Sequence, residues 1–177
     1  MPASPATIHV FTFKDGLLAR LAHDLRLTLG RFEIQRDGAA LTGRFWPASL
    51  TVDGAMTRQG QLDAHALSDS DRRKIEQNIA EDVLHLARAP EASFSGRILA
   101  GEAAVEGELT LAGRSAAVQA PVRAADGRLR AELTLVPSRW GIAPYRALAG
   151  AIKLQDRVLV VVDLPAQIDE RWTWTAG

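Results

Sequence analysis

Residues 103–136, AAVEGELTLAGRSAAVQAPVRAADGRLRAELTLV, alternate apolar and polar side chains through three segments that are separated by turn residues. In the first segment Val105, Leu109 and Leu111 fall on one face, and two glutamates and a threonine fall on the other. This period of two is typical of a half-buried β-strand. The second turn contains the pair Asp126-Gly127, which tolerates the positive φ angles of tight hairpins. The stretch therefore predicts a three-stranded antiparallel meander with one apolar face.

The composition is ordinary for one globular domain, because the chain has 177 residues and 47% of them are hydrophobic. We expect residues 1–177 to form a single domain, with residues 1–7 and 166–177 as candidate flexible tails. Lysine and arginine together number 21, as do aspartate and glutamate, so the net charge is zero. A neutral chain has no general attraction to nucleic acid or to anionic membrane surfaces, and neither is expected as a partner.

Two absences limit the chemistry and the location that the sequence predicts. The chain has no cysteine, which excludes disulfides, thiolate metal sites and cysteine nucleophiles. Its N-terminus has no basic segment followed by an apolar run, and no apolar run reaches the ~18 residues that a membrane span needs. We therefore expect a cytoplasmic protein with no integral membrane span.

Strand patterns outside the meander bring the expected number of strands to eight. The five further segments are Ile8 to Lys14, Asp24 to Gln35, Leu41 to Val52, Ala92 to Ala100 and Ile152 to Leu164. The apolar parity changes at Gly30 and again beside Pro47, which predicts a bulge in one strand and a bend or edge position in another. An antiparallel sheet of about eight strands closes into a barrel that is filled by side chains or encloses one small ligand. The sequence thus predicts an all-β, eight-stranded antiparallel barrel.

One strong helix is expected between the third and the fourth predicted strands, in residues 68–87. Ser68 and Asp71 resemble a capping box at its start. The apolar stripe comprises Ile75, Ile79, Val83 and Leu86, and charged residues occupy the opposite face. We expect this amphipathic helix to cover an apolar opening as a lid. Residues 16–25 suggest a short helix or turn, and residues 53–67 a loop.

Several segments together resemble the YceI-like proteins, extended lipocalin-like barrels that bind polyisoprenoid lipids. They are GRFEIQRDG (30–38), ALSDSDRRKIEQNI (66–79), APEASFSGRI (89–98), GELTLAGRSAAVQAPV (107–122), and SRWGI (138–142) followed by AIKLQDRVLVVVDL (151–164). The resemblance covers nearly the whole chain and implies a lipocalin-like barrel with an isoprenoid ligand. The chain departs from the family in lacking an export signal, in having GLLARLAHDLRL (16–27) where the family has a glycine-rich approach, and in the charge of its helix.

The apolar faces are the candidate ligand site. A filled core is the ordinary role of such faces, but the small residues Ala116, Ala120 and Gly107 share them with leucines and would leave volume in the lumen. An aliphatic lumen would favour a long hydrocarbon chain, since burial contributes ~0.8 kcal/mol per methylene. The expected ligand-binding residues are Phe32, Phe45, Val105, Leu109, Leu111, Leu133, Leu135 and Trp140.

His23 and Asp24 form the sharpest polar pair, and two roles remain open for them. They could stand at the barrel mouth, where an imidazole changes charge near neutral pH, or Asp24 could turn the chain while His23 is structural. The other histidines have no metal-binding spacing, and the chain contains no nucleophile-elbow or phosphate-loop motif. We expect no cofactor, no metal and no catalytic residue.

Three functions follow in order of preference. The first is non-enzymatic binding or carriage of an isoprenoid or other fatty, lipid-like molecule in the lumen. The second is an enzyme that acts on a small apolar substrate with His23 at the mouth. The third is a structural module that forms a homodimer through the lid helix or through a tail containing Trp172 and Trp174, which the sequence leaves either exposed or in an edge flap.

Overall fold

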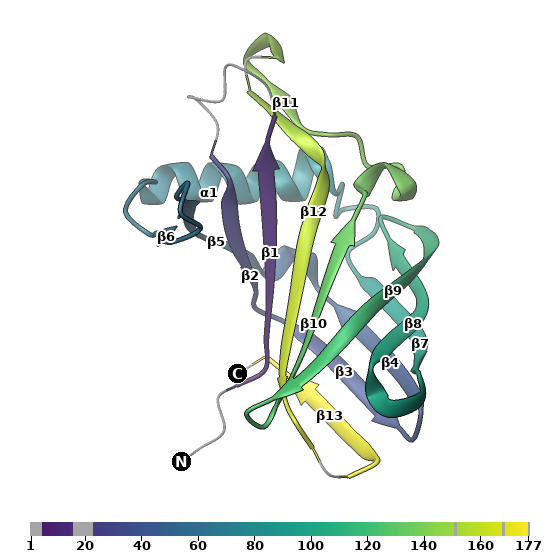
Figure 1. Cartoon of the computed structure of the whole chain (residues 1–177). Helices are drawn as coiled ribbons and strands as arrows, with labels where there is room; N and C mark the ends of the chain where they lie inside the picture. The colour runs from purple at the N-terminus through teal and green to yellow at the C-terminus, as the bar shows by residue number, and fades with distance from the viewer. Residues whose placement is uncertain (1–4, 16–22, 151, 168, 177) are drawn as a thin grey trace.

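The computed structural model describes residues 5–15, 23–150, 152–167 and 169–176, and most of them belong to one curled antiparallel sheet (Figure 1). The strands are β1 (Thr7–Lys14), β2 (Leu25–Leu29), β3 (Phe32–Asp37), β4 (Ala40–Phe45), β5 (Leu50–Met56), β6 (Leu62–Asp63), β7 (Ala92–Ile98), β8 (Ala104–Leu111), β9 (Arg114–Ala125), β10 (Arg128–Leu135), β11 (Arg146–Ala147), β12 (Ile152–Pro165) and β13 (Arg171–Thr175). Their hydrogen-bonded order is β13-β3-β4-β7-β8-β9-β10-β12-β1-β2-β5-β6, and β11 pairs with β12.

The predicted meander is present as β8, β9 and β10. Ala112-Gly113 and Asp126-Gly127 form its two turns, and all four residues have positive φ, between 51° and 75°. Two consecutive positive φ angles fit the right-handed twist of the flanking strands. Opposite residues in β8 and β9 include Leu109 and Ala116, so large and small apolar side chains face each other across this wall.

The expected count of eight strands is wrong, because two of the predicted strands are each broken in two by a bend and because β6, β11 and β13 lie outside the predicted strands. β2 and β3 are separated at Gly30, whose N–H donates to Ser49 O at 3.0 Å, and β4 and β5 are separated by a short 3-10 turn, η1 (Pro47–Ser49). β2 pairs with β5 and β3 pairs with β4, so the two bends lie opposite each other in one long hairpin. Among the described residues the ladder order runs from β13 to β6 without returning to its first strand, so the predicted closed barrel is wrong and the sheet is open.

The predicted loop at residues 53–67 and the predicted tail both contain strand. β5 continues to Met56 and pairs with β6 inside the segment expected to be a loop. β13 lies within the expected tail and pairs with β3, which buries Trp174 to 4% exposure and leaves Trp172 at 38%. The aromatic pair thus divides between the core and the surface. The short helix or turn expected at residues 16–25 lies mostly outside the described residues.

The amphipathic helix is shorter than expected and lies after six strands instead of three. Helix α1 (Asp69–Asn78) begins with the predicted capping box, in which Ser68 Oγ accepts from Asp71 N and Asp71 Oδ2 accepts from Ser68 N. A π-helical turn, η2 (Ile79–Val83), follows, and Leu84 N donates to Ile79 O five residues back. The helical turns end at Val83, so Leu86, which was predicted to belong to the apolar stripe, lies beyond them, and Leu84 lines the cavity beside Val83.

Buried side chains form three clusters around the curled sheet. The first cluster contains Phe32, Ile34 and Trp174, where β13 pairs with β3. In the second cluster, Leu27 and Val52 pack against apolar residues of α1. The third surrounds Trp140, which belongs to the 3-10 turn η4 (Pro137–Trp140). In the described part of the chain no helix is long and apolar enough to cross a membrane.

Candidate functional site

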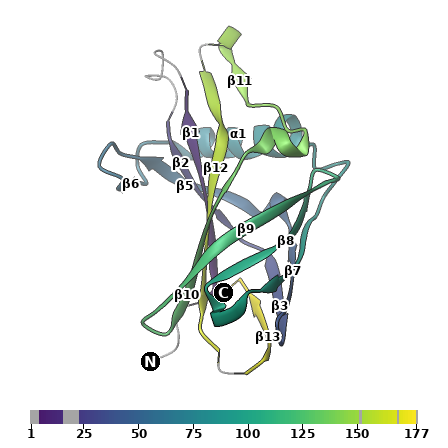
Figure 2. The same ribbon diagram turned by 45° about the vertical axis from the view of Figure 1, so that its right-hand side comes forward.

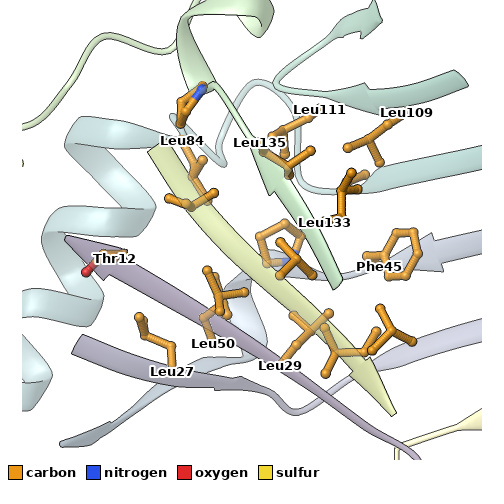
Figure 3. A pocket seen from close by; sticks show the side chains of 18 of the residues that line it. Thr12, Leu27, Leu29, Phe45, Leu50, Leu84, Leu109, Leu111, Leu133 and Leu135 are labelled. Atoms are coloured by element: carbon orange, nitrogen blue, oxygen red, sulfur yellow. The ribbon is translucent and has the colours of Figure 1, made fainter. Parts of the chain in front are cut away.

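A large apolar cavity occupies the inside of the sheet. Its volume is about 820 Å³, within the usual range for small-molecule sites. In Figure 3 the labelled leucines of β2, β5, β8 and β10 point into it, together with Leu84 from the end of η2 and Phe45 from β4. Its aliphatic lining includes Leu27, Leu29, Leu50, Leu109, Leu129, Leu133, Val158, Val160 and Val162. Strand alternation explains this lining, because the inward face of each strand is the one that the sequence makes apolar.

Glycines without side chains make room for two aromatic rings in the cavity wall. A Cβ on Gly43 would stand 2.6 Å from Phe45 Cζ, and one on Gly107 would stand 2.7 Å from Phe94 Cζ. A Cβ on Gly96, opposite Gly107, would also collide with the ring of Phe94. Each ring therefore lies against bare backbone instead of filling the lumen. Phe94 lines the cavity but was not among the predicted ligand-binding residues, although it shares the strand parity of Gly96.

The structure brings six of the predicted ligand-binding residues together and leaves two outside the lining. Those at the cavity wall are Phe45, Val105, Leu109, Leu111, Leu133 and Leu135. Phe32 is 2% exposed and packs in the cluster with Trp174, while Trp140 is 1% exposed and donates through Nε1 to Leu109 O at 2.8 Å. Phe32 and Trp140 therefore pack in buried clusters behind the residues that line the cavity.

The predicted polar pair divides between two roles. His23 is exposed and lines the cavity at its α1 end. Asp24 does not line the cavity, since its Oδ1 accepts from Lys14 N at 2.8 Å and its backbone O accepts from Met56 N at 2.7 Å. Asp24 thus connects β1, β2 and β5 at this edge, as expected if it turns the chain.

Other polar side chains gather at the α1 end of the cavity, and the sequence analysis did not single them out. Asn78 Nδ2 donates to the hydroxyl of Tyr145 at 2.9 Å, which joins the end of α1 to the segment before β11. Thr12 Oγ1 is shielded from solvent and has no hydrogen-bond partner among the described residues. Thr12 has the same inward parity as Ile8 and Val10, so alternation alone could have placed it in the lumen.

α1 and η2 cover this end of the cavity with the apolar residues Ile75, Ile79, Val83 and Leu84. The cover is attached to the sheet by Glu76, whose Oε1 accepts from the backbone N of Val52 at 2.8 Å. Hydrogen bonds from the side chain and backbone of Ser68 lower the pKa of Asp71, which also lines the cavity. The predicted lid is thus a helix with an apolar inner face and specific polar attachments.

The remaining titratable cluster lies on the outer face of the sheet. His9 Nδ1 is 3.0 Å from Thr28 Oγ1, Thr28 donates to Asp53, and Arg26 Nε donates to Asp53 Oδ2 at 2.7 Å. Burial, and after it the charge of Arg26, lowers the pKa of His9. The described residues include no group of three or more histidine, aspartate or glutamate side chains arranged to hold a metal ion.

Comparisons with known proteins agree with this architecture. The family model of the YceI-like domain matches residues 24–166. BcnA of Burkholderia cenocepacia superposes with a TM-score of 0.58 at 15% identity, over 92% of this chain and 96% of that one. A polyisoprenoid-binding domain from Saccharophagus degradans, implicated in plant cell wall breakdown, gives 0.55 at 10% identity, over 92% and 94%. At these identities the two structures show the fold alone. No curated protein sequence matches the chain.

Proposed function

The chain belongs to the YceI-like family, and we propose that it binds an isoprenoid or another lipid-like apolar molecule in its lumen without transforming it. The observation that carries the proposal is the cavity of about 820 Å³ with its aliphatic lining. Burial of ten methylenes there would contribute about 8 kcal/mol before the cost of association is subtracted. The Saccharophagus degradans domain, described as polyisoprenoid-binding, supports the same class of ligand.

The hydroxyl of Thr12 supports one orientation of this ligand. Most of the lumen offers hydrocarbon contacts, and its hydrogen-bonding groups include Thr12, Asn78 and Tyr145 as well as Arg36 and Thr42 on β3 and β4. A buried hydroxyl without a partner costs free energy, and a ligand oxygen beside Thr12 Oγ1 would remove that cost. The ligand therefore places its apolar tail against the aliphatic lining and an oxygen-bearing end beneath α1.

The test is to extract the purified protein with organic solvent and to identify the extract by mass spectrometry. The stripped protein is then titrated with farnesol, geranylgeraniol and palmitic acid. Leu109→Arg puts a charge into the lumen and should abolish uptake, whereas Glu108→Arg, exposed on the same strand, should bind like the wild type. If Leu109→Arg fails to fold, Val105→Asn serves as the lumen variant. Protein that yields no apolar compound and takes up none of the three ligands would overturn the proposal.

A further inference from the structure

β9 and β10 separate a few residues beyond the turn that joins them. Their ladder contains four residue pairs and ends where Ala131 faces Val122. Both strands continue, β9 paired with β8 as far as Arg114 and β10 paired with β12 as far as Leu135. Figures 1 and 2 show the two ribbons diverging from their shared hairpin in both views. The wall of the lumen is thus unpaired between residues 114–121 and 132–135.

Side chains of η4 limit this separation at its upper end. Trp140 Nε1 donates to Leu109 O at 2.8 Å, and Arg139 Nη2 donates to Ala117 O at 3.0 Å. These bonds attach the segment that follows β10 to β8 and β9. The separation is therefore a window, with the β9–β10 ladder below it and η4 above it.

The same window lies between the lumen and a groove on the outer surface. The groove is lined by Ser95, Gly96, Arg97, Glu106, Gly107, Ala117, Val118, Gln119, Leu133, Thr134 and Arg139. Two of these residues, Val118 and Leu133, also line the lumen. Val118 belongs to β9 and Leu133 to β10, so one apolar side chain from each edge of the window borders both hollows, and both side chains pack against the buried cluster around Trp140.

We propose that this window is a lateral portal through which the apolar ligand enters and leaves the lumen, with Val118 and Leu133 as its gate. The proposal rests on the lumen-binding function proposed above. Opening the sheet at a paired strand would break backbone hydrogen bonds, each contributing about 1 kcal/mol net. No such ladder joins β9 to β10 beyond Ala131 in the described part of the chain. Movement of side chains, without loss of a backbone ladder, can therefore open the wall here.

The α1 end is a more strongly attached alternative route. Displacing α1 would break the bond from Val52 N to Glu76 and the bond from Asn78 to Tyr145. It would also expose the apolar residues with which α1 covers the cavity, including Ile75 and Ile79. The portal requires neither change, which favours passage through the side of the sheet while the polar end of the ligand rests beneath α1.

The test closes the window covalently. Gln119 and Thr134 both line the outer groove from opposite edges, and the chain has no native cysteine. The double variant Gln119→Cys/Thr134→Cys is joined with a thiol-specific bismaleimide, and complete linkage is verified by mass spectrometry. Stopped-flow fluorescence then measures the association and dissociation of dansyl-labelled farnesol. We expect the link to slow both rates by about tenfold or more and to leave Kd nearly unchanged, because a higher barrier alters both directions equally.

The matched control places the same link where the wall is already paired. Glu106 and Gln119 are opposite residues of β8 and β9, so linked Glu106→Cys/Gln119→Cys should retain the rates of the unlinked protein. Unchanged rates in linked Gln119→Cys/Thr134→Cys, with normal binding, would overturn the portal and place entry at the α1 end. Failure of the unlinked protein to bind would overturn both the portal and the lumen-binding function.

Discussion

Phe94 lies so close to Gly107 that a Cβ on the glycine would stand 2.7 Å from the Cζ atom of the ring. The same Cβ would also approach Ser95 O to 2.4 Å, across the ladder between β7 and β8. The position of an aromatic ring in the lumen wall thus depends on the absence of a side chain on the neighbouring strand.

Gly107→Ala should destabilise the protein by about 1–3 kcal/mol, the usual cost of forcing an extra carbon into a packed wall. Phe94→Leu in the same chain should recover only part of the loss, because Ser95 O also obstructs the new Cβ. Urea unfolding monitored by circular dichroism measures both changes. Glu108→Ala, exposed on the same strand, is the control and should stay close to the wild type. A wild-type stability for Gly107→Ala would contradict the close packing.

Glu76→Ala should loosen α1 from the sheet. It leaves the backbone N of Val52, a residue only 4% exposed, without its acceptor, at a cost of about 1–3 kcal/mol. Hydrogen exchange should be faster at the Val52 amide and along α1. Glu76→Gln retains a side-chain oxygen and should preserve most of the protection. Equal protection in the alanine and glutamine variants would show that the bond does not attach the helix.

Thr12→Val should raise the stability of the empty protein and lower its affinity for the ligand. Removing a buried hydroxyl that has no partner among the described residues should stabilise the empty protein by about 1 kcal/mol. The same change should weaken binding of farnesol, because the ligand oxygen loses its partner. Thermal melts and a farnesol titration measure the two effects. Thr134→Val, on the exposed face of β10, is the control. Tighter farnesol binding by Thr12→Val would contradict the proposed orientation.

The lowered pKa of His9 predicts a pH-dependent stability. Burial, and next Arg26, disfavour the charged imidazole in the folded protein, so between the lowered pKa and 6.5 the unfolded chain binds more protons. The free energy of unfolding should therefore rise with pH through this window. His9→Gln should flatten that rise, as measured by urea unfolding between pH 5 and pH 8, a range chosen to bracket the ordinary titration of histidine.

The control for that experiment is His65→Gln, which removes an exposed histidine that takes no part in the hydrogen bonds joining His9, Thr28 and Asp53. It should retain the wild-type slope. If His9→Gln keeps the full rise with pH, another group is responsible for it.

Period-two alternation predicted much of the lumen because it depends only on neighbouring residues. Val105, Leu109 and Leu111 reach the cavity as their parity in β8 requires. Phe32 has the expected inward parity too, yet it packs against Trp174 from the opposite end of the chain. Alternation shows on which face a side chain lies, but not whether a distant segment covers that side chain.

The bends show the same limit for the count of strands. Parity changes at Gly30 and beside Pro47 indicated the two places where the long hairpin is interrupted. They did not reveal that the two bends lie side by side, where Gly30 N donates to Ser49 O. Nor did they reveal that each bend divides its own predicted strand into two. The register between strands brings the bends together, and it is set only when the hairpin folds.

By itself the sequence determined the meander, the inward apolar faces and the capping box of α1, because strand alternation, turn residues and caps act over a few neighbouring residues. Only the tertiary structure decided that Trp174 enters the core, that Thr12, Asn78 and Tyr145 meet at one end of the cavity, and that β9 separates from β10. These features join segments far apart in the chain. Their free energy depends on sheet twist, strand register and side-chain packing, which exist only once the whole sheet has assembled.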